Sequence, residues 1–176
     1  MPKAEEIIRH LKLEPLPVEG GWFRQTLCSP EKIPADALPT RYSGEKPFGT
    51  VIYFLLTDEP DCFSALHRLP TDETYHFYFG DPVELLLLHP GGRSEPVVLG
   101  HDLLGGQHVQ VTVPHGVWQG SRLLPGGKFA LMGTTMAPGF TPGDFTGGDR
   151  EELIKQFPKE AGRIRALTRP GAPKHL

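Results

Sequence analysis

Glycine and proline divide most of this 176-residue chain into short apolar runs, and this division restricts the possible folds more than any other feature of the sequence. The 21 glycines and 19 prolines stand between runs of strand length, so we interpret them as turn residues and not as a sign of disorder. The runs are residues 22–27, 48–56, 62–68, 74–79, 83–89, 97–99, 109–113, 117–123 and 128–136. Their spacing predicts an all-β sandwich or barrel, and the lack of helical patterns between them argues against a parallel βαβ sheet.

Helical patterns occur only near the two ends of the chain. Residues 4–13 place apolar side chains at helical spacing, and Pro15 and Pro17 then end the pattern. Asp149 has the position of a helix N-cap ahead of an apolar face at residues 153–157, so we expect short helices at the C-terminus. The sequence contains neither a repeat nor a linker, so we expect one domain over residues 1–176 with its barrel core at about 19–145. Residues 29–47 form the longest irregular stretch, and loops of this length are functional or mobile.

The charges of the chain exclude several classes of partner. Eighteen basic and 21 acidic residues are well mixed and give a net charge of −3, and no Lys/Arg run indicates nucleic acid or an anionic membrane surface. The sequence shows neither a signal-peptide hydrophobic stretch nor a run of about 18 apolar residues, so we expect a cytoplasmic protein. Cys28 and Cys62 lack metal-binding spacing; we expect both to be reduced and buried, with one disulfide as the alternative.

The stretch HRLPTDETYHFYFG, residues 67–80, contains the most suggestive combination of polar side chains. Strand alternation predicts that Phe63, Ala65 and His67 share a face, so that His67 points inward if Phe63 does. A single inward histidine is more often a satisfied core residue, but a turn at residues 70–72 can bring Glu73 beside this one. A buried carboxylate needs a partner, so we expect a His67–Glu73 neighbourhood that performs acid–base chemistry or binds a metal.

Several motifs carry a resemblance to a known family. His67, Glu73 and Gly80 match three positions of the first cupin motif, and Pro114 and Gly116 match the core of the second. Together with EGGWFRQT, VIYFLL and APGFTPGDF, these segments make the chain resemble a functionally uncharacterised group of one-domain cupins, which has been likened to sugar epimerases. The resemblance implies a double-stranded β-helix, which is a small jelly-roll-like β-barrel with a pocket in its mouth. It also implies an N-terminal helix, short C-terminal helices and a homodimer.

The chain departs from the metal-binding cupins at two positions. Leu69 and Gln119 stand where a typical member has histidine. The metal ligands that remain are His67, Glu73 and Gln119, and His76 could join them only if a bulge turned it inward. Because transition metals prefer imidazole to an amide oxygen, we expect a pocket without a cofactor, with a divalent metal as the alternative.

The resemblance to cupins that epimerise keto-sugars implies candidate roles for individual residues. His67 would be the catalytic base, Glu73 would orient it, and Tyr53 would be the acid, with Tyr75 and Tyr78 as alternatives. The remaining candidates for substrate binding are Arg24, Tyr75, His76, Trp118 and Gln119, while Asp144 is a second candidate for a catalytic carboxylate. We expect a cupin that binds a small polar metabolite, such as a sugar or nucleotide derivative, and transfers a proton. The two alternatives are a metal-dependent enzyme and a non-catalytic small-molecule-binding protein.

Overall fold

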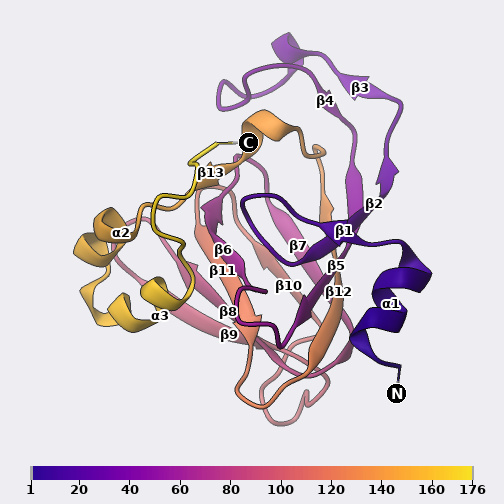
Figure 1. Cartoon of the computed structure of the whole chain (residues 1–176). Helices are drawn as coiled ribbons and strands as arrows, with labels where there is room; N and C mark the ends of the chain where they lie inside the picture. The colour runs from indigo at the N-terminus through magenta and orange to yellow at the C-terminus, as the bar shows by residue number, and fades with distance from the viewer. Residues whose placement is uncertain (1, 176) are drawn as a thin grey trace.

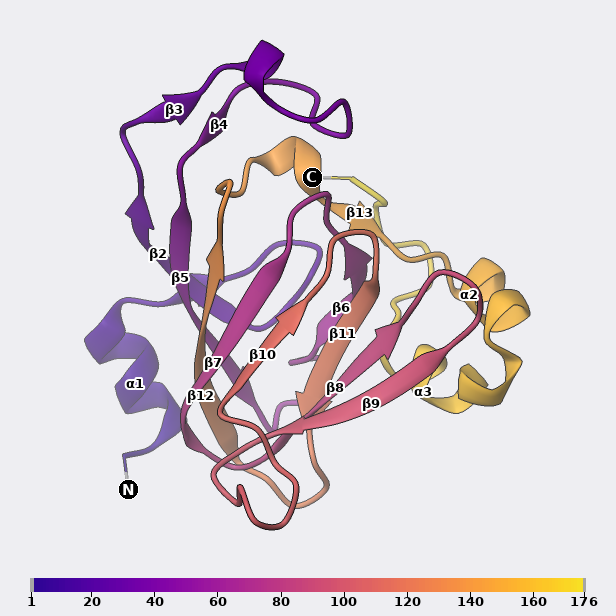
Figure 2. The same ribbon diagram turned by 180° about the vertical axis from the view of Figure 1, so that it is seen from behind.

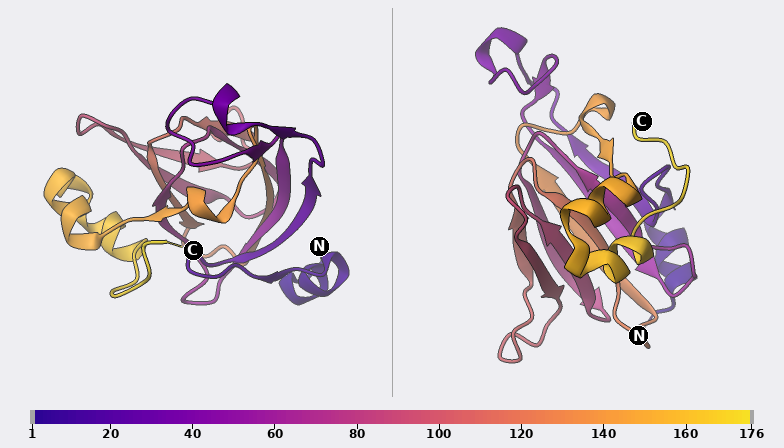
Figure 3. Two further views of the ribbon diagram at one scale, coloured as in Figure 1. Left: turned by 90° about the horizontal axis from the view of Figure 1, so that it is seen from above. Right: turned by 90° about the vertical axis from the view of Figure 1, so that its left-hand side faces the viewer.

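The computed structural model describes residues 2–175, and most of its strands belong to two antiparallel sheets that face each other (Figure 1). The first sheet has the order β1 (Glu14–Pro15), β2 (Trp22–Cys28), β5 (Thr50–Thr57), β12 (Phe129–Met136), β7 (Glu73–Gly80) and β10 (Gln110–Val113). The second has the order β13 (Thr146–Gly147), β6 (Ser64–Arg68), β11 (Trp118–Leu123), β8 (Val83–Leu88) and β9 (Ser94–Leu99). Viewed from above, the two sheets curve into a barrel, which confirms the predicted all-β class (Figure 3).

Each of the nine predicted apolar runs overlaps a strand, but the stretch at residues 29–47 is less irregular than expected. Within it, β3 (Lys32–Ile33) pairs with β4 (Lys46–Pro47), and the short 3₁₀-helix η1 (Ala35–Ala37) lies between them. We call residues 29–47 the arm, because they project beyond one end of the barrel (Figure 2). These two strands could not be predicted from the sequence, since two-residue pairings are too short to show a period.

The apolar run of β8 is explained by burial on both of its faces. Leu85 and Leu87 point into the barrel, while Leu86 and Leu88 pack outward against the C-terminal helices. These helices are α2 (Arg150–Gln156), η3 (Pro158–Glu160) and α3 (Ala161–Ala166), and they cover the outside of the second sheet (Figure 3). Burial of a leucine side chain stabilises the fold by about 1.5–3 kcal/mol. Because the helices cover the outer face of β8, leucines occupy outer positions where a strand facing solvent would have polar residues.

The helices occur near the two predicted ends of the chain. Helix α1 (Ala4–Leu11) packs Ile7 against Leu55 and Leu131, on the outer face of the first sheet. The helix ends at Leu11, and its C-cap Lys12 has a left-handed φ of 53°, so the helix stops before Pro15. Asp149 caps α2 by accepting a hydrogen bond from the Glu152 amide at 3.0 Å, as its position in the sequence predicted. Within residues 2–175, none of these helices combines the length and apolarity needed to cross a lipid bilayer.

Candidate functional site

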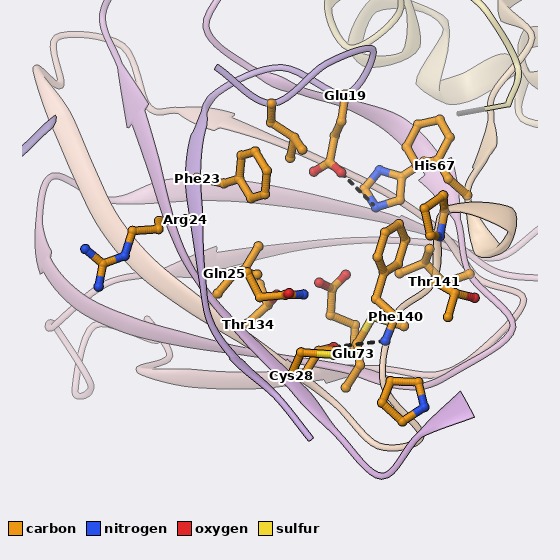
Figure 4. Close-up of a pocket in the computed structure, with 18 of the residues that line it drawn as sticks. Glu19, Phe23, Arg24, Gln25, Cys28, His67, Glu73, Thr134, Phe140 and Thr141 are labelled. Carbon is orange, nitrogen blue, oxygen red and sulfur yellow. Dashed lines mark hydrogen bonds and ion pairs between the residues drawn. The ribbon is translucent and has the colours of Figure 1, made fainter. Parts of the chain in front are cut away.

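A cavity of about 640 Å³ opens at the end of the barrel from which the arm projects. Its apolar wall includes Phe23, Ile52, Leu69, Met136, Phe140 and Phe145. Its polar lining includes Glu19, Gln25, His67, Glu73 and Thr134 (Figure 4). The other end of the interior is filled by core side chains such as Phe54, Leu85 and Met132. The barrel therefore presents a small group of polar side chains inside a mainly apolar hollow, as small-molecule sites commonly do.

A bulge in β6 sets the direction of His67. In the pairing with β11, Gln119 lies opposite His67 and Ser121 opposite Ser64, so β6 holds one more residue than β11 between these two pairs. Ser64 and His67 therefore both face the interior although they are three positions apart. Phe63 instead packs against the outer cluster beneath the C-terminal helices, so the prediction that it shares a face with His67 is wrong. The inward position of His67 itself agrees with the structure.

One ring nitrogen of His67 is hydrogen-bonded to the backbone, and the other faces the cavity. Its Nδ1 lies 2.8 Å from the carbonyl oxygen of Ala65, which can only accept a hydrogen bond, so Nδ1 carries the proton of the neutral ring. The ring is 1% exposed and stacks on Phe145, with centroids 5.2 Å apart and planes 17° apart. Nε2 then presents its lone pair on the side of Glu19, whose Oε2 is 3.9 Å away (Figure 4). An imidazole in this state can accept a proton.

Glu19 is a residue of this site that the sequence reasoning missed. Its backbone carbonyl accepts hydrogen bonds from the Ala65 amide at 2.8 Å and from the Arg169 guanidinium at 2.9 Å, which fixes the segment against β6. Its side chain accepts a hydrogen bond from Ser64 Oγ at 2.7 Å. Gly20 follows with φ of 97°, and a Cβ there would lie 2.5 Å from a backbone carbonyl oxygen. The sequence signal that could have revealed Glu19 is its position directly before two glycines, which let this segment approach the backbone at Phe63 closely.

Glu73 faces the cavity because it begins β7 on the inward side of the strand alternation. The carboxyl is 7% exposed and accepts a hydrogen bond from Gln119 Nε2 at 2.8 Å. Burial raises the pKa of Glu73, and the charge of Glu19 raises it further, while His67 and hydrogen bonds from Thr134 and Gln119 lower it in part. The site therefore favours the protonated form of this carboxyl more than water does, which makes it a candidate proton donor.

The structure does not support a tyrosine as the general acid. Tyr53 points to the outside of the first sheet, where its ring lies edge-on to Tyr78 at 6.3 Å between centroids. Tyr75 points inward but is 1% exposed within the apolar core, and burial raises its pKa well above 10. Tyr42 also lies outside the lining of the cavity. The assignment of Tyr53 as the acid, and of Tyr75 as a substrate-binding residue, is therefore wrong.

Three further candidates for substrate binding point away from the cavity. His76 alternates outward on β7, and its Nε2 lies 3.1 Å from Thr135 Oγ1, so it joins neither a ligand set nor the pocket. Arg24 borders the mouth, but its guanidinium points outward and donates to the carbonyl of Leu11 at 2.8 Å (Figure 4). Trp118 packs against the outer cluster beneath the C-terminal helices. Strand alternation explains all three, since each has an inward-facing neighbour in the chain.

Asp144 is part of a buried ion pair and not of the cavity lining. Its carboxylate pairs with the ammonium of Lys46, and the two side chains are 2% and 1% exposed. The same carboxylate accepts a hydrogen bond from the Thr141 amide at 2.7 Å, and the Thr141 hydroxyl accepts one from Lys46. This cluster ties β4 of the arm to the short helix η2 (Pro142–Asp144) at the rim of the cavity. The role of a second catalytic carboxylate is therefore not supported for Asp144.

The donor set does not fit a metal ion. Among residues 2–175, no group of three or more His, Cys, Asp and Glu side chains is arranged to hold one. Leu69 lines the cavity where an imidazole would be needed, and it cannot coordinate. Gln119 directs its amide nitrogen to Glu73, while its Oε1 is buried without a hydrogen-bond partner among the described residues. The predicted ligand set of His67, Glu73 and Gln119 thus lacks a third donor directed at a common point.

The two cysteines have different environments. Both are free thiols; Cys62 is buried as expected, whereas Cys28 is exposed. Cys28 lies at the end of β2 and lines the mouth of the cavity, so the expectation that it is buried is wrong.

Comparisons with known proteins identify the relatives of this chain. A family model described as "Cupin superfamily (DUF985)" matches residues 5–147. The uncharacterized protein YML079W of Saccharomyces cerevisiae is 28% identical over 159 residues, which cover 85% of this chain and 78% of the yeast protein. Protein SO0799 of Shewanella oneidensis has a crystal structure that matches with a TM-score of 0.82 at 32% identity, covering 97% of this chain and 99% of that one.

Two further solved structures separate close from distant similarity. A hypothetical protein from Leishmania major matches with a TM-score of 0.82 at 28% identity, covering 95% of this chain and 99% of that one. The oxalate decarboxylase of Bacillus subtilis matches with a TM-score of 0.54 at 16% identity, covering 94% of this chain and 39% of that enzyme. That enzyme is described with Mn(II) centres, but a match at this identity shows only a shared fold.

Proposed function

Because the chain belongs to the DUF985 family of the cupin superfamily, we propose that its barrel cavity binds a small molecule and that His67 transfers a proton to or from it. The observation that carries this proposal is the orientation of the His67 ring. The Ala65 carbonyl occupies Nδ1, so the lone pair of Nε2 is left for a ligand in the cavity. The reaction class is isomerisation or epimerisation next to a carbonyl group, of a small metabolite such as a sugar derivative.

The proton balance of this reaction uses two residues of the cavity. Nε2 of His67 removes a proton from the carbon next to the carbonyl, and the electron pair of that C–H bond forms the enol double bond. The carbonyl oxygen gains the proton that Glu73 releases, since its raised pKa favours the protonated carboxyl. For isomerisation, His67 delivers its proton to the former carbonyl carbon, and the hydroxyl on the neighbouring carbon gives its proton to Glu73 as the new carbonyl forms. For epimerisation, the proton returns to the other face of the original carbon, and the enol proton returns to Glu73. Either route restores both residues. Glu73 therefore takes the acid role that the resemblance to keto-sugar epimerases implied for a tyrosine.

A second candidate function is binding without turnover. It is favoured by the absence of a tyrosine from the cavity lining and by walls that are mainly apolar. Both candidates use the same cavity, and they differ only in whether a bound carbonyl compound exchanges a proton with His67.

The test is hydrogen–deuterium exchange into a panel of small uncharged ketones and ketoses in D₂O, followed by proton NMR. The active protein should accelerate exchange next to the carbonyl by about 10²–10⁴-fold, and His67→Gln should abolish the acceleration. The matched control is His76→Gln, because that histidine lies on β7, the next strand in the chain, but faces outward. Equal exchange in wild type and His67→Gln would refute the catalytic proposal, and binding without exchange would favour the second candidate.

A further inference from the structure

The charged side chains around the cavity are unevenly distributed between its mouth and its deep end. The lining contains the acids Glu14, Glu19 and Glu73 and the bases Arg24 and Lys32, in addition to His67. The two bases belong to β2 and to the arm, at the mouth. Glu19, Glu73 and His67 lie together at the deep end, where the charges of both carboxyls and the imidazole affect one another (Figure 4).

Neither base at the mouth is directed at the group formed by Glu19, Glu73 and His67. Lys32 forms an ion pair with Glu45 within the arm. Arg24 directs its guanidinium outward, where it donates to the Leu11 carbonyl and lies 6.0 Å from the centre of the Tyr53 ring. A phosphate or carboxylate that reaches the deep end would lose water there without meeting either of these cations, which is costly for a charged group.

The deep end cannot become positively charged in any protonation state with Glu19 ionised. When Glu73 is protonated and His67 is a cation, the formal charges of the three groups sum to zero. When His67 is neutral, the sum is negative. Ser64 already donates to one oxygen of Glu19, which leaves Oε2 and the nearby Nε2 of His67 as acceptors directed at the cavity.

The remaining surface of the cavity favours carbon-rich ligands. Phe23, Ile52, Phe140 and Phe145 come from four different segments and surround the polar deep end. Apolar surface of this kind contributes roughly 25 cal/mol for each Å² of ligand that it covers. Gln25 and Thr134 add neutral polar groups but no charge.

We propose that the cavity selects a molecule with an apolar body and a hydrogen-bond-donating head that is neutral or cationic, and that it rejects phosphorylated and carboxylated ligands. The inference rests on the proposed use of this cavity for ligand binding, and it narrows the substrate class by removing nucleotide-linked sugars. An alcohol or amine head donates to Glu19 and Nε2 of His67, while the body packs against the aromatic wall. A cationic head is also attracted by the negative charge of Glu19.

The test compares three probes that share one skeleton: 2-phenylethylamine, 2-phenylethanol and 3-phenylpropanoate. Dissociation constants are measured at pH 7 by isothermal titration and by ligand-observed NMR on the full chain. We expect the amine and the alcohol to bind at least about tenfold more tightly than the carboxylate, because one charge-assisted hydrogen bond contributes that much or more. Glu19→Gln should lower amine affinity about tenfold, whereas Glu14→Gln at the mouth should change it less.

The wild-type affinity ratio needs no variant, so the test remains decisive if Glu19→Gln fails to fold. Equal or tighter binding of 3-phenylpropanoate overturns the inference, and so does a failure of both the amine and the alcohol to bind at millimolar concentration. Carboxylate binding combined with His67-dependent proton exchange would overturn only the charge selection. Amine selectivity with no exchange in any carbonyl compound would instead overturn only the proposed catalysis.

Discussion

The buried ion pair between Lys46 and Asp144 gives the sharpest prediction of stability. These side chains are 1% and 2% exposed, and they connect the arm to the rim of the cavity. Lys46→Met leaves a buried carboxylate without its cation, and Asp144→Asn leaves a buried ammonium without its anion. Breaking a buried pair from one side costs about 3–5 kcal/mol of unfolding free energy. For a chain of this length, each kcal/mol lowers the melting temperature by about 2–4 °C, so each variant should melt roughly 6–20 °C lower.

The double variant separates the charge interaction from the loss of either side chain. Asn at position 144 retains an oxygen that can accept from the Thr141 amide, so the cap of η2 is preserved in the cycle. Lys46→Met with Asp144→Asn should therefore lose less than the sum of the single variants, with a coupling energy of about 1–3 kcal/mol. The assay is equilibrium urea unfolding followed by tryptophan fluorescence, with the slope checked for two-state behaviour.

A matched control is available on the same arm. Lys32 and Glu45 form an ion pair with side chains that are 55% and 58% exposed. Lys32→Met and Glu45→Gln should each leave the urea midpoint nearly unchanged, because solvent screens this pair. If the single changes at Lys46 and Asp144 were as small as these, or if their effects simply added, the account of a desolvated pair would be wrong.

Two further predictions concern the site and the outer layer. Because burial raises the pKa of Glu73, the folded protein keeps a proton that the unfolded chain releases near pH 4.5, so stability should fall as pH rises from 4.5 through the raised pKa. Urea midpoints measured across this pH range should fall less in Glu73→Gln, and an unchanged profile would contradict the raised pKa. Leu86→Ala should cost about 2–5 kcal/mol beneath the C-terminal helices, while Leu104→Ala, at a fully exposed leucine, should leave the urea midpoint nearly unchanged.

Local sequence patterns predicted the positions of the strands and helices well, because these depend mainly on residues close together in the chain. Glycine and proline marked the limits of the apolar runs that form strands in the structure. The continuous apolar run of β8 reflects burial on both of its faces. The cap at Asp149 was also visible, since a helix start depends on neighbours three residues apart. The predicted homodimer depends on a surface shared by two chains, and it stays a prediction.

The site was harder to predict, because its residues meet across the barrel. Alternation alone gave the outward direction of His76, but it could not reveal the bulge that places Ser64 beside Glu19. Lys46 and Asp144 are 98 positions apart, and no local signal pairs them. Sequence reasoning therefore named His67, Glu73 and Gln119 through motif spacing, and it missed Glu19 and Ser64, which the closed barrel brings to them.

The most direct test of the central claim is the tautomer of His67, measured by long-range proton–nitrogen NMR on ¹⁵N-labelled protein. His67→Gln identifies the signals of this ring by their loss. We predict that the neutral ring carries its proton on Nδ1 and that Nε2 is unprotonated, with the Nε2 signal changing when a ligand enters the cavity. A neutral ring with its proton on Nε2 would mean that no base faces the ligand, and it would contradict the proposed proton transfer.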